Sequence, residues 1–186
     1  MKFKKLSILF CSLLALTSVM AVSAAETETV SETEAASAEE STVSGADEET
    51  EYPITIQHAY GETVIESKPE RIATVGWENQ DAPLALGIAP VGVSAANYGM
   101  VTENNLHPWT DEAFQELGVD APNVFDDVDG LDFEAISDCD PDVILASYSG
   151  LTQEDYDTLS QIAPVIPYKE NAWQTTWRDQ TIENAE

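Results

Sequence analysis

Four short, largely apolar runs constrain the fold of this chain more than any other feature of its sequence. They occupy residues 72–75, 91–93, 143–146 and 165–166. A strand with one face in water alternates polar and apolar residues, and these runs do not. Helix-like stretches separate them, among them 82–86 and the stretch that Thr152 can cap. We therefore expect an α/β fold in which helices cover both faces of a parallel sheet.

Shorter patterns predict the remaining elements. These are a hairpin at 54–65 around Gly61, a strand at 124–125, a helix at 133–136 and a last helix at 173–185. Trp173 and Trp177 are four residues apart, so they would share one face of that last helix. Packing in the core is their simplest role. The folded domain is expected to span residues 52–186.

The first 25 residues predict an export signal. Lysines at positions 2, 4 and 5 precede an apolar run at 6–16, and small residues precede Ala25 as at a cleavage site. The run is short for a stable membrane span, and an uncleaved anchor is the alternative.

The two cysteines do not predict a disulfide. Cys11 lies inside the apolar run, where Phe10 before it disfavours lipidation and cleavage of the signal would remove it. Cys139 would then be alone in the mature chain, so the fold must depend on its core.

Residues 26–51 form a distinct acidic segment. Ten of these 26 residues are Asp or Glu, nine are Ser or Thr, and none is Lys or Arg. Such a composition cannot bury enough apolar surface to offset ordering entropy, so we expect a disordered linker. It would serve as a tether for the domain or only as a solubilising spacer.

The charge of the chain also excludes some partners. The formal net charge is -28, which repels the phosphates of nucleic acids and of anionic lipids. We therefore expect no nucleic-acid partner.

Motifs of enzymes and metal sites are missing from the sequence. It contains no Gly-x-Ser-x-Gly, no phosphate-binding glycine-rich loop and no His-Glu-x-x-His. The acidic run at 126–132 lacks the spacing of an EF-hand loop and is better interpreted as an exposed turn. His58 and His107 have no partner at zinc-ligand spacing. We expect a protein that is neither an enzyme nor a carrier of a resident cofactor or metal.

Four blocks of residues resemble one family. They are Lys-Pro-Glu-Arg-Ile at 68–72, Leu-Ala-Leu-Gly-Ile-Ala-Pro-Val-Gly at 84–92, Phe-Glu-Ala-Ile at 133–136 with Pro-Asp-Val-Ile at 141–144, and Leu-Ser-Gln-Ile-Ala-Pro-Val at 159–165. In this order they resemble the siderophore, haem and cobalamin class of solute-binding proteins of ABC importers.

The resemblance implies a fold with two Rossmann-like lobes and a ligand between them. Residues 52–186 are similar to the first lobe only, and the last predicted helix has no stop signal before Glu186, so a truncated chain is expected. The resemblance also implies an exported, monomeric protein at the outer face of the membrane or in the periplasm. Such a protein captures a ferric siderophore and delivers it to a permease.

Three aromatic residues follow three predicted strands and are the candidate ligand contacts. Trp77, Tyr98 and Tyr148 lie where parallel strands end, which is where α/β proteins bind ligands. Their rings could stack on the flat arms of a chelator. Each could equally be a packing residue. Arg178 could contact an anionic ligand or pair with a neighbouring acid.

Glu134 is the candidate for permease docking. In the family, a surface Glu of each lobe pairs with arginines of the permease, and Glu134 occupies the matching position in the Phe-Glu-Ala-Ile block. A carboxylate in a first helical turn is also favoured by the helix dipole alone, which is the alternative explanation.

The class of the cargo is predicted from two stretches. Residues 97–117 and 156–173 look more like the branch that binds catecholate siderophores, so catecholate is favoured. The alternative function is a cell-surface adhesive or structural module with no small-molecule ligand.

Overall fold

The structure, a computed structural model, describes residues 50–185. The predicted export signal and nearly all of the predicted acidic linker lie outside the described residues. Within residues 50–185, none of the helices is long and apolar enough to cross a lipid bilayer.

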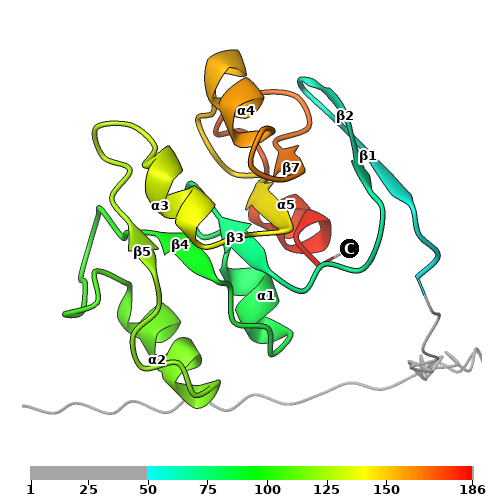
Figure 1. The fold of residues 1–186 in the computed structure, drawn as a ribbon. Helices are drawn as coiled ribbons and strands as arrows, with labels where there is room; N and C mark the ends of the chain where they lie inside the picture. The colour runs from blue at the N-terminus through cyan, green and yellow to red at the C-terminus, as the bar shows by residue number, and fades with distance from the viewer. Residues whose placement is uncertain (1–49, 186) are drawn as a thin grey trace, which may run out of the picture. The chain divides into compact units, whose positions relative to one another are not determined.

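A parallel sheet of five strands forms the centre of the domain (Figure 1). In the order β5-β4-β3-β6-β7, its strands are β3 (Ile72–Thr74), β4 (Gly92–Ser94), β5 (Val124–Phe125), β6 (Val143–Ala146) and β7 (Val165–Pro167). Each pair of neighbours runs parallel. The prediction of a parallel α/β sheet from the apolar runs is confirmed. Because the chain adds strands on both sides of β3, the direction of strand addition reverses beside this strand.

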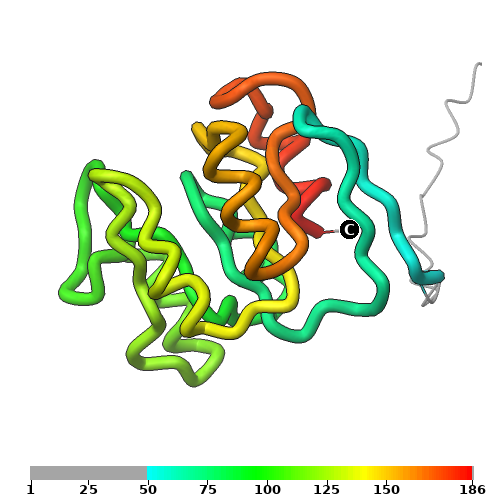
Figure 2. Tube along the Cα trace, turned by 45° about the horizontal axis from the view of Figure 1, so that its top comes forward, coloured from blue at the N-terminus to red at the C-terminus, as the bar shows by residue number. Residues whose placement is uncertain are grey.

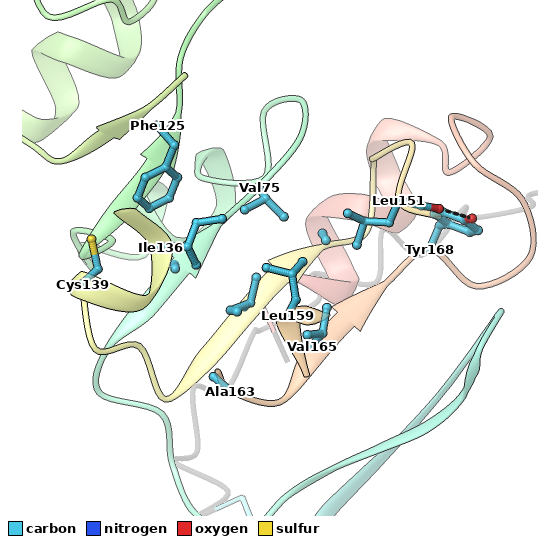
Figure 3. Close-up of a cluster of buried hydrophobic side chains, with 12 residues drawn as sticks. Val75, Phe125, Ile136, Cys139, Leu151, Leu159, Ala163, Val165 and Tyr168 are labelled. Atoms are coloured by element: carbon cyan, nitrogen blue, oxygen red, sulfur yellow. Dashed lines mark hydrogen bonds between the residues drawn. The ribbon is translucent and has the colours of Figure 1, made fainter. Parts of the chain in front are cut away.

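Both faces of the sheet are buried, which explains why its strands do not alternate. Ile144 and Ala146 of β6 belong to one core cluster, and Val143 and Leu145 to another. The first cluster lies under α3 (Phe133–Asp138) and α4 (Gln153–Leu159) and is drawn in Figure 3.

Two further helices cover the opposite face. α1 (Asp81–Ala85) and α2 (Pro108–Glu116) enclose a third cluster, which contains Leu84, Val93, Leu106 and Phe114. α2 was not predicted, because its polar sequence after Pro108 carries few apolar residues at helical spacing.

The predicted hairpin is confirmed. β1 (Ile54–His58) and β2 (Gly61–Ile65) pair antiparallel, with His58 opposite Gly61. The hairpin lies along the β7 side of the sheet (Figure 2), where the Thr63 hydroxyl donates to the Val165 carbonyl oxygen at 2.7 Å. His58 donates from Nε2 to the same hydroxyl at 2.9 Å, and its burial lowers its pKa.

The prediction of a helix from residue 173 is wrong. α5 spans Trp177–Glu183, and Thr176 is its N-cap, accepting a hydrogen bond from the Asp179 N–H at 3.2 Å. Trp173 has a φ of +59°, which no helical residue adopts. Thr-x-x-Asp is an N-terminal capping pattern, so the sequence did contain the signal for the later start.

Two blocks of the sequence that are distant along the chain meet at the amino ends of β3 and β6. The Asp142 carboxylate accepts from the Glu70 and Arg71 N–H groups at 2.7 and 3.0 Å. The Arg71 guanidinium in turn donates to the Asp140 carbonyl oxygen, just past the end of α3, at 2.6 Å. These blocks therefore fix the entry to β3 and the end of α3.

The packing of β4 against β5 and the end of α3 can be tested at Gly92. A Cβ at this position would lie 2.2 Å from the Phe125 ring and 3.0 Å from the Cys139 sulfur. We expect Gly92→Ala to lower the free energy of unfolding by about 1–3 kcal/mol, the usual cost of overpacking a core. Urea denaturation measures this, with Ser137→Ala on the exposed face of α3 as control. Equal stabilities of the two variants would contradict the packing described.

Candidate ligand site

A pocket of about 250 Å³ opens at the carboxyl edge of the parallel sheet. Segments that follow all five strands line it. They contribute Gly76 and Trp77 after β3, Ala95 and Asn97 after β4, Asp127, Gly130 and Leu131 after β5, Ser149, Gly150, Leu151 and Asp155 after β6, and Trp173 after β7. This edge, beside the strand where the order reverses, is the usual ligand position in open α/β sheets.

Gly76 sets the position of Trp77. The loops after β3 and β6 approach so closely that a Cβ at Gly76 would lie 2.8 Å from the Tyr148 carbonyl oxygen. Gly76 also has a φ of +84°, which side chains disfavour. The next N–H, that of Trp77, donates to the same Tyr148 oxygen at 3.0 Å. Trp77 is thereby held at the pocket, half-buried.

Further aromatic rings lie beside Trp77. The centroid of the Tyr98 ring lies 6.5 Å from that of Trp77, and the His107 ring meets Trp77 edge-on at 5.5 Å. Trp109 stacks on His107 at 4.4 Å. His107 is buried and donates from Nδ1 to the Met100 carbonyl oxygen at 3.2 Å. His107 and Trp109 could not be connected with the site from the sequence, because the N-terminus of α2, where both lie, was not predicted.

Trp173 lines the pocket beside the loop after β6. Its indole lies over Gly150, where a Cβ would come within 2.6 Å of Nε1. The Tyr148 ring meets it edge-on at 5.3 Å. The predicted core-packing role is wrong for both tryptophans of this region, since Trp173 is 52% and Trp177 73% exposed. They also share no helix face, because only Trp177 belongs to α5.

The other predicted contacts lie outside the lining of the pocket. The ring of Tyr98, which is 78% exposed, contacts Trp77, and the ring of the half-buried Tyr148 contacts Trp173. Arg178 lies on α5 with its guanidinium 5.2 Å from the Trp177 ring centroid. The ligand roles of Trp77, Tyr98, Tyr148 and Arg178 stay predictions.

A buried network of amides holds α5 against the ends of the strands. The Asn79 carboxamide oxygen is fully buried and accepts from Ser147 Oγ at 3.1 Å, Asn184 Nδ2 at 3.0 Å and Gln180 Nε2 at 3.2 Å. Gln180 Nε2 also donates to the Trp77 carbonyl oxygen at 2.8 Å. A buried polar group that is fully paired fixes its surroundings. The network therefore stabilises the backbone of the pocket.

Carboxylates are the charged groups at the pocket. Asp127 and Asp155 line it, and no Lys or Arg is among its lining residues in the described part of the chain. Asp126 and Asp129 are exposed as the sequence predicted for this acidic turn, whereas Asp127 is half-buried. Nearby, desolvation and the Glu78 carboxylate raise the pKa of Asp81 to about 6. Among residues 50–185 no three His, Cys, Asp or Glu side chains gather where they could hold a metal ion.

The comparison with protein families defines the class. A family model described as periplasmic binding protein matches residues 72–186. Because the match covers more than half of the chain, the chain belongs to the periplasmic binding protein family.

Individual relatives extend this comparison. The probable siderophore-binding lipoprotein YfiY of Bacillus subtilis (strain 168) is 29% identical over 172 residues, which are 88% of this chain and 43% of that protein. PiaA of Streptococcus pneumoniae TIGR4, solved in complex with ferrichrome, is 56% identical with a TM-score of 0.67, over 71% of this chain and 44% of that chain. Staphylococcus aureus SirA, complexed with staphyloferrin B, is 27% identical with a TM-score of 0.54, over 71% and 41%. This chain spans less than half the length of these relatives.

Trp173 lies in a backbone conformation that favours glycine. Its φ of +59° costs a bulky residue free energy, which glycine avoids. We expect Trp173→Gly to change the melting temperature little, because relief of this backbone cost offsets the lost contact with the Tyr148 ring. Thermal denaturation measures the effect.

Trp177→Ala is the matched control. This tryptophan is exposed on α5 and does not line the pocket, so its loss should also leave the melting temperature nearly unchanged. A clear fall in the melting temperature of the Trp173 variant alone would contradict the balance of the two effects at Trp173.

Proposed function

We propose that this chain belongs to the substrate-binding component of an ABC importer, which captures a ferric siderophore and delivers it to the permease. The observation that carries the proposal is the pocket at the carboxyl edge of the sheet, lined by Trp77 and Trp173. Two relatives support it, since PiaA was solved with ferrichrome and SirA with staphyloferrin B. The relatives are solute-binding proteins, which fits the expectation of a non-enzyme.

The chemistry of such a cargo suits this pocket. A siderophore encloses its ferric ion with its own oxygen atoms, so the protein must recognise the outside of a complex. Broad aromatic rings supply contact area with few rotatable bonds, and the half-buried Trp77 and the exposed Trp173 present such rings. Polar groups of the lining, such as Asn97, can fix the orientation of the complex.

The proposed location is the outer face of the cell membrane. The predicted export signal and the acidic segment support it, and the Bacillus subtilis relative is named a lipoprotein. The acidic segment would then act as a tether between the membrane and the domain. A cell-surface adhesive module remains the alternative function, and ligand binding separates the two.

Titration with a ferric siderophore tests the proposal. We expect ferrichrome to quench the tryptophan fluorescence of the exported full-length protein saturably, because energy passes from the rings at the pocket to the coloured complex. Gallium-loaded ferrichrome, which has the same shape, should compete for the site. Linear quenching without competition would favour an adhesive or structural module.

Glu134 is proposed to dock the permease. It is exposed in the first turn of α3, beside the N-cap Asp132, which accepts from the Ala135 N–H at 3.0 Å. Arginine pairs with a carboxylate in a bidentate geometry, which would fix the orientation of the bound lobe.

Charge reversal tests this docking. We expect Glu134→Arg to abolish uptake of radioactive ferric siderophore by cells while the affinity of the purified protein stays the same. The control is Asp138→Arg, which reverses an exposed charge at the other end of the same helix. Normal uptake by the Glu134 variant would refute the role.

A further inference from the structure

We propose that Asp127 and Asp155 make this pocket select ferric complexes by their charge, accepting neutral and cationic complexes and disfavouring trianionic ones. The inference rests on the proposed function and names the class of substrate more narrowly. It differs from the catecholate cargo that the sequence predicts.

The two carboxylates come from different elements and line the same pocket. Asp127 follows β5, and Asp155 lies in the first turn of α4, after β6. Both side chains are half-buried. A charge in this position is incompletely screened by water, so it acts on a bound ligand more strongly than a surface charge does.

Asp155 is held in a fixed position. Its Oδ2 accepts from the Thr152 N–H at 2.9 Å and from the Thr152 hydroxyl at 2.7 Å, as part of the capping box of α4. Capping alone would explain this residue, but it does not explain Asp127. No hydrogen bond or ion pair joins the Asp127 carboxylate to another residue within the range 50–185, so it can accept from a ligand.

Basic residues do not balance these charges in the described part of the chain. The chain has seven Lys and Arg residues, and four of them lie in the domain. None of these four residues lines the pocket. Lys68 lines a separate groove beside the hairpin, Arg71 donates to the Asp140 carbonyl oxygen, Lys169 pairs with Glu183 at 3.0 Å, and Arg178 lies over Trp177.

Ferric siderophores differ widely in charge. Three catecholate arms leave the complex a trianion, whereas three hydroxamate arms give a neutral one. A hydroxamate chelator with a free amine gives a cation. The two carboxylates that the described residues contribute repel the trianion, leave the neutral complex unaffected and attract the cation. An ammonium or amide N–H of the ligand would also find an acceptor in Asp127.

Three probes of different charge test the inference on the exported full-length protein at low ionic strength. They are ferrioxamine B as a cation, ferrichrome as a neutral complex and ferric enterobactin as a trianion. We expect the trianion to bind at least tenfold more weakly than ferrichrome, and the cation at least as tightly as ferrichrome. Added salt should narrow these differences.

Isosteric variants show whether the two aspartates cause the ranking. The double variant Asp127→Asn, Asp155→Asn keeps the shape of the pocket and an acceptor for the Thr152 cap. It should bind the trianion at least threefold more tightly, and the cation more weakly, than the unchanged protein does. The control, Asp126→Asn with Asp157→Asn, neutralises two exposed neighbours outside the lining and should change nothing.

The outcomes separate the two proposals. If none of the three complexes binds, the proposed function fails. If ferrichrome binds but the trianion binds equally well, or if the double variant binds the trianion no more tightly than the unchanged protein does, only the selection by charge is overturned.

Discussion

The close approach of the loops after β3 and β6 is the contact on which the site depends. Gly76 permits it, because any side chain there would collide with the Tyr148 carbonyl oxygen and the Ser149 Cβ. The same approach allows the buried Asn79 amide to donate to the Val75 and Tyr148 carbonyl oxygens at 2.8 and 3.1 Å. The two central loops are thereby joined, and the tryptophans that follow or contact them are held in place.

Most of the fold could be predicted from the sequence, because the sheet is buried on both faces. Runs such as 143–146 have no polar side that a half-exposed strand would need, and turn residues separate them from the helices. α2 was missed, since a polar helix on the surface gives little periodicity. The predicted helix at 173–185 starts too early, because Thr176 caps α5 and the backbone at Trp173 is not helical.

The site was harder to predict than the fold. Trp77 could be placed at the pocket because it follows the predicted strand at 72–75. Trp173 could not, since its position depends on the contact with Gly150, which is distant along the chain, and on a backbone conformation unusual for tryptophan. Asp127 belongs to an acidic turn whose other carboxylates are exposed, and composition alone does not distinguish one aspartate from the next. Loop residues that meet only in the folded chain leave no local pattern.

The proposed function requires a ferric complex to lie against Trp77 and Trp173 at the carboxyl edge of the sheet. The four indole N–H signals of the chain can be followed by NMR while ferrichrome is added, with gallium-loaded ferrichrome as the diamagnetic reference. Iron broadens the signals of nearby protons, so the signals of Trp77 and Trp173 should disappear first and that of Trp177 should persist. Broadening of Trp177 before Trp77 and Trp173 would contradict the account.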